Sequence, residues 1–133
     1  MSAAGLPLIE MLKTRLHWHQ ARQKLLAENV ANADTPGFAP RDVAEPRFGP
    51  DGRAVAGRLA PVRTSPMHLA GAAAPSRGVT ETEGARFEVR PSGNAVNLEE
   101  EMLKVAQNQA DYQLAASLYE KSLAMLRTAV GRR

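Results

Sequence analysis

Few side chains in this sequence have the types and spacing that catalysis or metal binding requires. His17 and His19 are two residues apart in a predicted helix, about 200° around its axis, so they cannot converge on one metal ion. His68 lies in a loop with no acidic residue nearby in the sequence. The absence of cysteine excludes disulfides, thiolate metal ligands and thiol nucleophiles. The glycines do not form a phosphate-binding loop. We therefore predict no enzyme activity, no metal and no cofactor.

The run Glu99–Glu101 has the residue types for acid–base chemistry or calcium binding. It lies at the start of a predicted helix, where negative side chains complement the positive end of the helix dipole. We interpret the three carboxylates as helix-stabilising.

Two asparagines, Asn29 and Asn32, need a reason for their position. Asn costs about half a kcal/mol or more relative to Ala inside a helix. Their amides could bond the last carbonyls of the helix, or they could bond a neighbouring subunit or fix the chain where it leaves the helix. The sequence leaves these alternatives open.

These asparagines end a predicted helix that runs from Pro7 to about Asn32. Pro7 suits a first helical turn, and Pro36 disfavours a helical conformation at Thr35. Thr35-Pro36-Gly37-Phe38 predicts a turn with Pro second and Gly third. Steps of three and four place one seam on this helix: Ile9, Leu12, Leu16, His19, Gln23, Leu26, Val30 and Ala33.

A second helix is predicted at the C-terminal end. A 4-3 spacing gives it a heptad seam of Leu98, Met102, Val105, Gln109, Tyr112, Ala116, Tyr119, Leu123, Leu126 and Val130. Such a seam is typical of a helix that packs along its length against a partner helix. Asn97, with Glu100 three residues later, predicts its N-terminal cap.

The middle of the chain, residues 38–93, contains most of the prolines and glycines and shows neither strand nor helix periodicity. Only Arg86–Arg90 alternates like a short strand, before a turn at residues 91–94. We predict a mainly α fold, a coiled-coil pair joined by a weakly structured middle with at most a small β-hairpin. Its divisions are an assembly helix (1–37), a loop-rich middle (38–93) and a heptad helix (94–133), together one structural unit.

The overall charge of +3 and pI of about 9.7 raise the question of nucleic-acid binding. The basic residues are spread along the chain and form no clustered patch for phosphates, so we expect no nucleic-acid partner. No window has the 18 apolar residues that a membrane span needs. The start lacks a basic region and Glu10 interrupts its apolar run, so we expect no cleaved Sec signal peptide.

The N-terminal helix and its end resemble the motif N-I-A-N-x-x-T-P-G-[YF] of the flagellar axial family, the rod and hook proteins. The matching residues here are Asn29, Ala31, Asn32, Thr35, Pro36, Gly37 and Phe38. Residues 41–42, 64–69, 93–102 and 126–130 are also similar to the family's proximal rod subunits. Phe38 replaces the more frequent Tyr and keeps the aromatic ring, and Asn97 replaces a frequent Asp and keeps a capping oxygen. The short middle segment is unlike the larger β-rich insertion of hook and distal-rod proteins.

The resemblance implies a structural subunit of the proximal rod of the bacterial flagellar basal body. Its terminal helices would pair, and it would polymerise with itself and other rod proteins into a tube that connects the inner-membrane ring to the rest of the rod. Export-gate proteins are further implied partners, and no small-molecule substrate is implied. The family passes unfolded through the flagellar type III export apparatus without signal-peptide cleavage, reaches the periplasm, and is needed for motility.

A soluble coiled-coil adaptor or flagellar export chaperone, which binds a partner helix but is not built into a polymer, is the alternative. The heptad fits both functions. The NVANADTPGF stretch (residues 29–38) and the similar start of the last helix favour the rod subunit.

Overall fold

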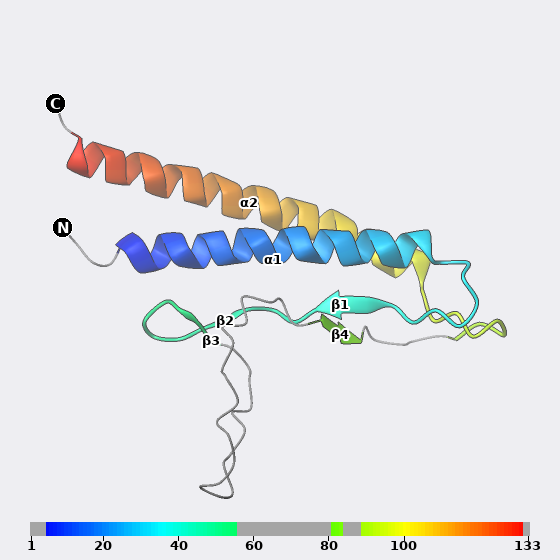
Figure 1. The fold of residues 1–133 in the computed structure, drawn as a ribbon. Coiled ribbons are helices and arrows are strands. Elements are labelled where there is room, and N and C mark those ends of the chain that lie inside the picture. Colours follow the sequence, from blue (N-terminus) through cyan, green and yellow to red (C-terminus); the bar gives the residue numbers. More distant parts are fainter. Residues whose placement is uncertain (1–4, 56–80, 84–88, 132–133) are drawn as a thin grey trace, which may run out of the picture.

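Three layers build the fold: a helix, a second helix and a thin layer of strands (Figure 1). The computed structural model describes residues 5–55, 81–83 and 89–131. Helices α1 (Gly5–Ala31) and α2 (Leu98–Val130) run antiparallel, so the start of α1 and the end of α2 lie at the same end of the pair. The expected mainly α fold with a pair of terminal helices is confirmed.

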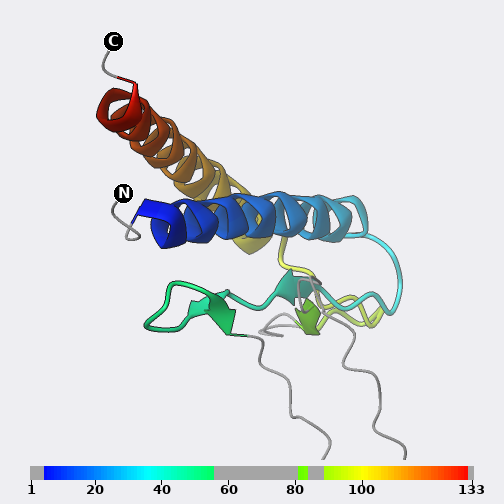
Figure 2. The ribbon, with the colours of Figure 1, turned by 60° about the vertical axis from the view of Figure 1, so that its left-hand side comes forward.

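The strands lie on the side of α1 that faces away from α2, as both ribbon views show (Figures 1 and 2). Strand β1 (Arg41–Val43) pairs antiparallel with β4 (Glu81–Glu83), and β2 (Arg47–Phe48) pairs antiparallel with β3 (Ala54–Val55). β2 and β3 form the small hairpin expected in the middle segment. The β1–β4 pair was not expected, because three-residue strands far apart in the sequence leave no alternating pattern.

Part of the predicted middle lies outside the described residues. This applies to residues 64–69, including His68, and to most of the strand predicted at Arg86–Arg90. The last two residues of that prediction, Val89 and Arg90, are described and do not belong to a strand.

Helix α1 packs on two sides. His19, which contacts α2, shares a row with buried Leu12 and Leu26 at a spacing of seven residues. On the other side, Trp18 and Leu25 form a buried cluster with Val43 of β1.

Polar contacts fasten the strand layer to the second side of α1. The Trp18 indole N–H donates to the Ala44 carbonyl at 2.7 Å, and Arg22 forms two bonds, of 2.9 and 3.0 Å, with the Asp42 carboxylate. The predicted single seam missed this side, because its residues alternate between apolar and charged types.

Helix α2 begins at a capped end. The Asn97 side-chain oxygen accepts the Glu100 backbone N–H at 3.4 Å. The Glu100 carboxylate does not complete a capping box; it pairs with Lys104 at 3.1 Å. Neither helix is long and apolar enough in any stretch to cross a membrane, as far as the described residues go.

Candidate assembly interface

Asn29 joins the end of α1 to both the strand layer and α2. Its side-chain oxygen accepts the Arg41 N–H at 3.0 Å, and its amide nitrogen donates to the Arg41 carbonyl at 2.7 Å. The same nitrogen donates to Glu101 of α2 at 2.8 Å. Of the alternatives for this residue, the structure shows it fixing the chain after the helix, within one subunit.

Asn32 behaves differently, although it belongs to the same motif. Its amide donates to the Glu28 carbonyl at 2.8 Å, one turn back, and its oxygen accepts the Thr35 hydroxyl at 3.0 Å. It therefore bonds one of the last carbonyls of α1, which was the other alternative.

The turn after α1 is held against the start of α2. Gly37 has φ of +71°, and the Phe38 N–H donates to the Thr35 carbonyl at 3.3 Å, as a turn with Gly third requires. The Gly37 N–H donates to the Ser92 carbonyl, and half-buried Phe38 accepts from the Ala95 N–H, both at 3.0 Å. The turn of residues 35–38 thus holds the end of α1 against the start of α2.

Asn94 closes the same junction from the other side, and the sequence analysis missed it. Its buried amide donates to the carbonyls of Asn32 and Thr35 at 2.9 and 2.6 Å. Its oxygen accepts the Val96 N–H at 2.9 Å. Asn94 lies within residues 93–102, which resemble the family, but directly after Gly93 in a predicted turn, where Asn is common for local reasons.

A third asparagine, Asn108, bridges the helices at mid-length and is 1% exposed. Its amide donates to the His19 carbonyl at 3.0 Å and to the Gln23 side chain at 2.9 Å. Its oxygen lies 2.7 Å from His19 Nδ1, so this ring nitrogen carries the proton and donates. His19 is therefore a structural hydrogen-bond donor in the helix interface, whereas His17 is exposed.

Glu101 has a role that helix-dipole complementation does not describe. It is 3% exposed and accepts from Asn29 and, at 3.0 Å, from Lys104. Burial alone lowers the pKa of Lys104, but hydrogen bonds to Glu101 and Glu100 and the charges of both outweigh it, so the pKa is raised above 10.5. The interpretation that all three glutamates serve only to complement the helix dipole is therefore wrong for Glu101.

The row of α2 that is buried in this chain is polar or small: Glu101, Asn108, Ala115 and Ser122. Each is seven residues from the next, the period of a helix pair. No buried side-chain nitrogen or oxygen lacks a partner among the described residues. The polar atoms can therefore be buried without the usual penalty.

The predicted C-terminal seam needs correction as an intrachain contact. One of its two rows lies half-buried beside the buried row: Val105, Tyr112, Tyr119 and Leu126. The other row is one residue off. In that row Ala116 and Leu123 are half-buried, but Met102, Gln109 and Val130 are exposed. Leu98, at the start of the first row, is exposed as well. The prediction assumed that apolar residues face α1, whereas hydrogen-bonded polar residues do.

The predicted N-terminal seam lies mostly toward the interior. Ile9, Leu12 and Leu26 are buried, and Leu16 and Val30 are half-buried. The remaining motif residue Ala31 is exposed, as are Thr35, Pro36 and Gly37.

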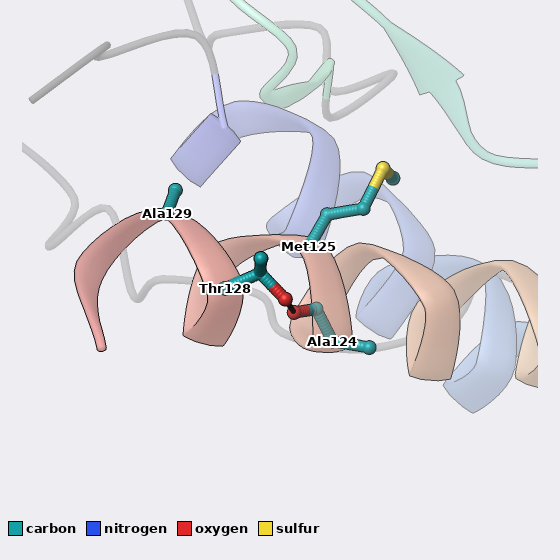
Figure 3. A pocket seen from close by; sticks show the side chains of 4 residues that line it. All are labelled: Ala124, Met125, Thr128 and Ala129. Atoms are coloured by element: carbon teal, nitrogen blue, oxygen red, sulfur yellow. Dashed lines mark hydrogen bonds between the residues drawn. The ribbon is translucent and has the colours of Figure 1, made fainter. Parts of the chain in front are cut away.

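The side of α2 that faces away from α1 is apolar, and the sequence analysis did not identify it. We call it the outer face; it comprises the exposed residues Leu103, Ala110 and Leu114. Exposed Leu118 and Met125 lie three residues after buried Ala115 and Ser122, beside the row that contacts α1. Near the C-terminal end of α2 a shallow, open depression is lined by Ala124, Met125, Thr128 and Ala129 (Figure 3). The Thr128 hydroxyl donates to the Ala124 carbonyl at 3.0 Å, so its polar group is already satisfied within the helix.

The exposed side of α1 has the opposite character. It carries Glu10, Lys13, His17, Gln20 and Lys24. The pair of helices therefore presents one polar side and one apolar side. Among the described residues no three His, Asp or Glu side chains are grouped to hold a metal ion.

Comparison with known proteins agrees with these features. The family described as "Flagella basal body rod protein" matches residues 11–38, which include the end of α1 and the turn after it. The flagellar basal body rod protein FlgB of Agrobacterium fabrum is 31% identical over 133 residues, covering 98% of each chain. FlgB of Salmonella typhimurium is 30% identical over 81% of each chain, and FlgB of Escherichia coli is 33% identical over 77% of each.

Proposed function

Since this chain belongs to the FlgB family of flagellar basal body rod proteins, and is thus a structural subunit of that rod, we propose that it joins its neighbours through the faces of α2 that α1 leaves uncovered. Rod subunits associate with other rod proteins in the basal body. The proposal adds which surface of this subunit does so.

One observation carries the proposal: α2 has exposed apolar side chains on several sides. They are Leu98, Met102, Leu103, Leu114, Leu118, Met125 and Val130. A helix that is apolar around most of its circumference is normally buried on most sides, and a large exposed apolar patch marks an interaction surface. In this chain α1 covers only one side, so neighbouring subunits must cover the others.

Assembly then contributes to folding. Ordering each residue costs about 1–2 kcal/mol of backbone entropy, and two helices that meet along one seam bury little surface in return. The polar composition of that seam reduces the hydrophobic gain further. Contacts with neighbours supply the remainder, so the α1–α2 pair is fully stable only in the rod.

The proposal also covers where the subunit lies in the flagellum. We place the subunit in the periplasmic, proximal rod, against the inner-membrane ring and the export gate, after export without a cleaved signal peptide. Residues 1–37, 38–93 and 94–133 act as assembly helix, connecting segment and second assembly helix of one unit. The proposed role is structural and involves no catalysis.

The test is to purify hook–basal bodies from the source bacterium and search them for this chain by immunoblot and mass spectrometry. We expect it at a few copies per structure, resistant to salt washing, and we expect loss of motility when its gene is deleted. Recovery of the chain only in the cytoplasmic fraction would overturn the proposal and favour an adaptor or export chaperone.

A further inference from the structure

The methionines of this chain differ in how far their side chains are exposed. Met102 and Met125 of α2 are 58% and 64% exposed. Met11 of α1 is half-buried, and a Cβ on Gly52, in the turn of the β2–β3 hairpin, would lie 3.3 Å from its sulfur. The two other methionines of the chain lie outside the described residues. A small reagent therefore reaches the two sulfurs of α2 more easily than that of Met11.

The two exposed methionines lie on opposite sides of the row of α2 that contacts α1. With about 100° between successive residues, Met102 lies between buried Glu101 and Leu103 of the outer face. Met125 comes three residues after buried Ser122, which places it about 60° around the helix in the other direction. Both belong to the exposed apolar side chains through which, in the proposed function, this subunit joins its neighbours.

Met125 lines the open depression near the end of α2 (Figure 3). The other lining residues are small, and the methionine side chain extends away from its helix. Thr128 supplies the one polar side chain of this lining, and its hydroxyl already donates to the Ala124 carbonyl at 3.0 Å. The sulfur is therefore accessible, and no lining side chain has a hydrogen-bond donor left for a new polar group on it.

Hydrogen peroxide converts a methionine thioether to the sulfoxide with no further reactant. The sulfur lone pair attacks one peroxide oxygen, so a sulfur–oxygen bond forms as the oxygen–oxygen bond breaks. The proton on the transferred oxygen moves to the departing hydroxide, which leaves as water. Sulfur is oxidised by two electrons and the peroxide is reduced by two. A flexible apolar side chain thereby becomes a polar one that accepts hydrogen bonds.

This new polar group has different consequences in the free and in the assembled chain. In the free chain water can bond the sulfoxide, and neither methionine belongs to the core, so the fold should be unaffected. Under an apolar neighbour the same group loses its water and finds no donor, which is costly. Oxidation of these two residues thus opposes assembly while it leaves the subunit folded.

We propose that Met102 and Met125 are peroxide-oxidation sites that control the incorporation of this subunit, the thioether form being accepted by its neighbours and the sulfoxide form rejected. The inference rests on the proposed function and adds a regulation of the same surface. Methionine sulfoxide reductases reverse the modification, so a rejected subunit is not lost.

Peroxide treatment of the purified chain tests the first part of the inference. We expect mass spectrometry to find the added oxygen at Met102 and Met125 several-fold sooner than at Met11, while helical circular dichroism and the urea midpoint stay unchanged. Equal rates at the three methionines would overturn the inference. So would a loss of helix on oxidation, because the effect would then be one of unfolding.

Incorporation is tested in cells that lack methionine sulfoxide reductases and receive a peroxide pulse while the chain is being synthesised. The wild-type chain is compared with the Met102→Leu/Met125→Leu double variant, which keeps the apolar surface and cannot be oxidised there. We expect several-fold fewer wild-type copies per basal body after the pulse and no decrease for the double variant. An equal decrease for both would overturn the inference, because peroxide would then act on another target.

His17→Met, introduced into the double variant, is the matched control, because it places an oxidisable sulfur on the polar side of α1. Its sulfoxide should occur in basal bodies at the same fraction as in the chain outside them. Exclusion of this sulfoxide would overturn the inference, since the position of the oxidised residue would then not matter.

Met102→Gln/Met125→Gln places polar groups of similar length at both sites without peroxide. We expect several-fold fewer copies of this variant per basal body, and wild-type amounts would overturn the inference. Absence of the untreated wild-type chain from basal bodies would instead contradict the proposed function itself, so the two failures are distinguishable.

Discussion

Three buried asparagines connect parts of the chain that are far apart in the sequence. Asn29 joins α1 to β1 and α2, Asn94 joins the start of α2 to the turn after α1, and Asn108 joins the two helices at mid-length. A buried amide is tolerated only when its hydrogen bonds are made, and each of these makes them in one arrangement of the helices. These residues therefore specify how the helices align, more than how strongly they adhere.

Asn29→Ala tests that role. It removes both side-chain bonds to Arg41 and one to buried Glu101, and we expect a loss of about 2 kcal/mol of unfolding free energy. Urea unfolding of the purified chain, followed by helical circular dichroism, measures it. Asn32→Ala is the matched control and should cost about 1 kcal/mol or less, since Asn32 acts at a partly exposed helix end. Equal losses for the two variants would contradict the assignment.

Lys104 predicts a pH dependence on the alkaline side. Although burial lowers its pKa, the bonds to Glu101 and Glu100 raise it above the ordinary 10.5. A group with a raised pKa in the folded state contributes stability that is fully present below the unfolded pKa and is lost as pH rises through the folded pKa. The contribution should therefore be intact below about pH 10 and decline above about pH 10.5.

The variant Lys104→Met, compared with the wild type, tests that prediction. The variant should be less stable than the wild type at neutral pH, and the gap between their unfolding free energies should narrow above about pH 10.5. Urea midpoints measured at several alkaline pH values give this comparison. A gap that stays constant with pH would show that the contacts of the lysine do not depend on its charge.

At the scale of elements, the junction between α1 and α2 depends on two glycines. Gly37 and Gly93 have φ of +71° and +79°, and a Cβ on Gly93 would lie 3.3 Å from the Gly37 Cα. A Cβ on Gly37 would meet nothing within 4 Å, so only the backbone conformation opposes a side chain there.

We expect Gly37→Ala to cost about 1 kcal/mol and Gly93→Ala to cost more, because the second adds crowding to the strain. Gly37→Asn should cost less than Gly37→Ala, since Asn tolerates positive φ. Thermal unfolding of the three variants gives the order. A Gly93→Ala variant as stable as the wild type would contradict the tight packing at this junction.

The helices themselves were largely predictable from the sequence, and their facing rows only partly. Pro7, Asn97 and the 35–38 turn are local signals, and local chemistry sets where helices begin and end. The row of α2 that faces α1 was misplaced by one residue because Glu101 and Asn108 are polar. Their burial depends on partners in α1 that lie more than seventy residues away in the sequence, with the Asn29–Glu101 pair 72 residues apart. No single-helix pattern contains that information.

At the scale of the whole molecule, the distribution of polar and apolar groups is opposite to that of a self-sufficient domain. Hydrogen-bonded polar residues occupy much of the helix interface, and leucines and methionines cover the outside of α2. This arrangement suits a chain that is completed by its neighbours.

The isolated chain should accordingly be least protected in the second half of α2. There the buried row changes to Ala115 and Ser122, and the network of Asn29, Glu101 and Asn108 no longer contributes. Hydrogen exchange of the purified chain should show faster exchange for residues 115–130 than for residues 100–112. Uniform slow exchange along the helix would contradict folding on assembly.

The most direct test of the central claim, that α2 joins the rod through the faces α1 leaves uncovered, is the amount of chain in purified hook–basal bodies of a Leu114→Asp strain. Leu114 is exposed, so the variant should fold and accumulate normally, and His17→Asp places the same charge on the polar side of α1. We predict wild-type amounts for His17→Asp and no incorporation for Leu114→Asp. Incorporation of Leu114→Asp at the wild-type level would contradict the account.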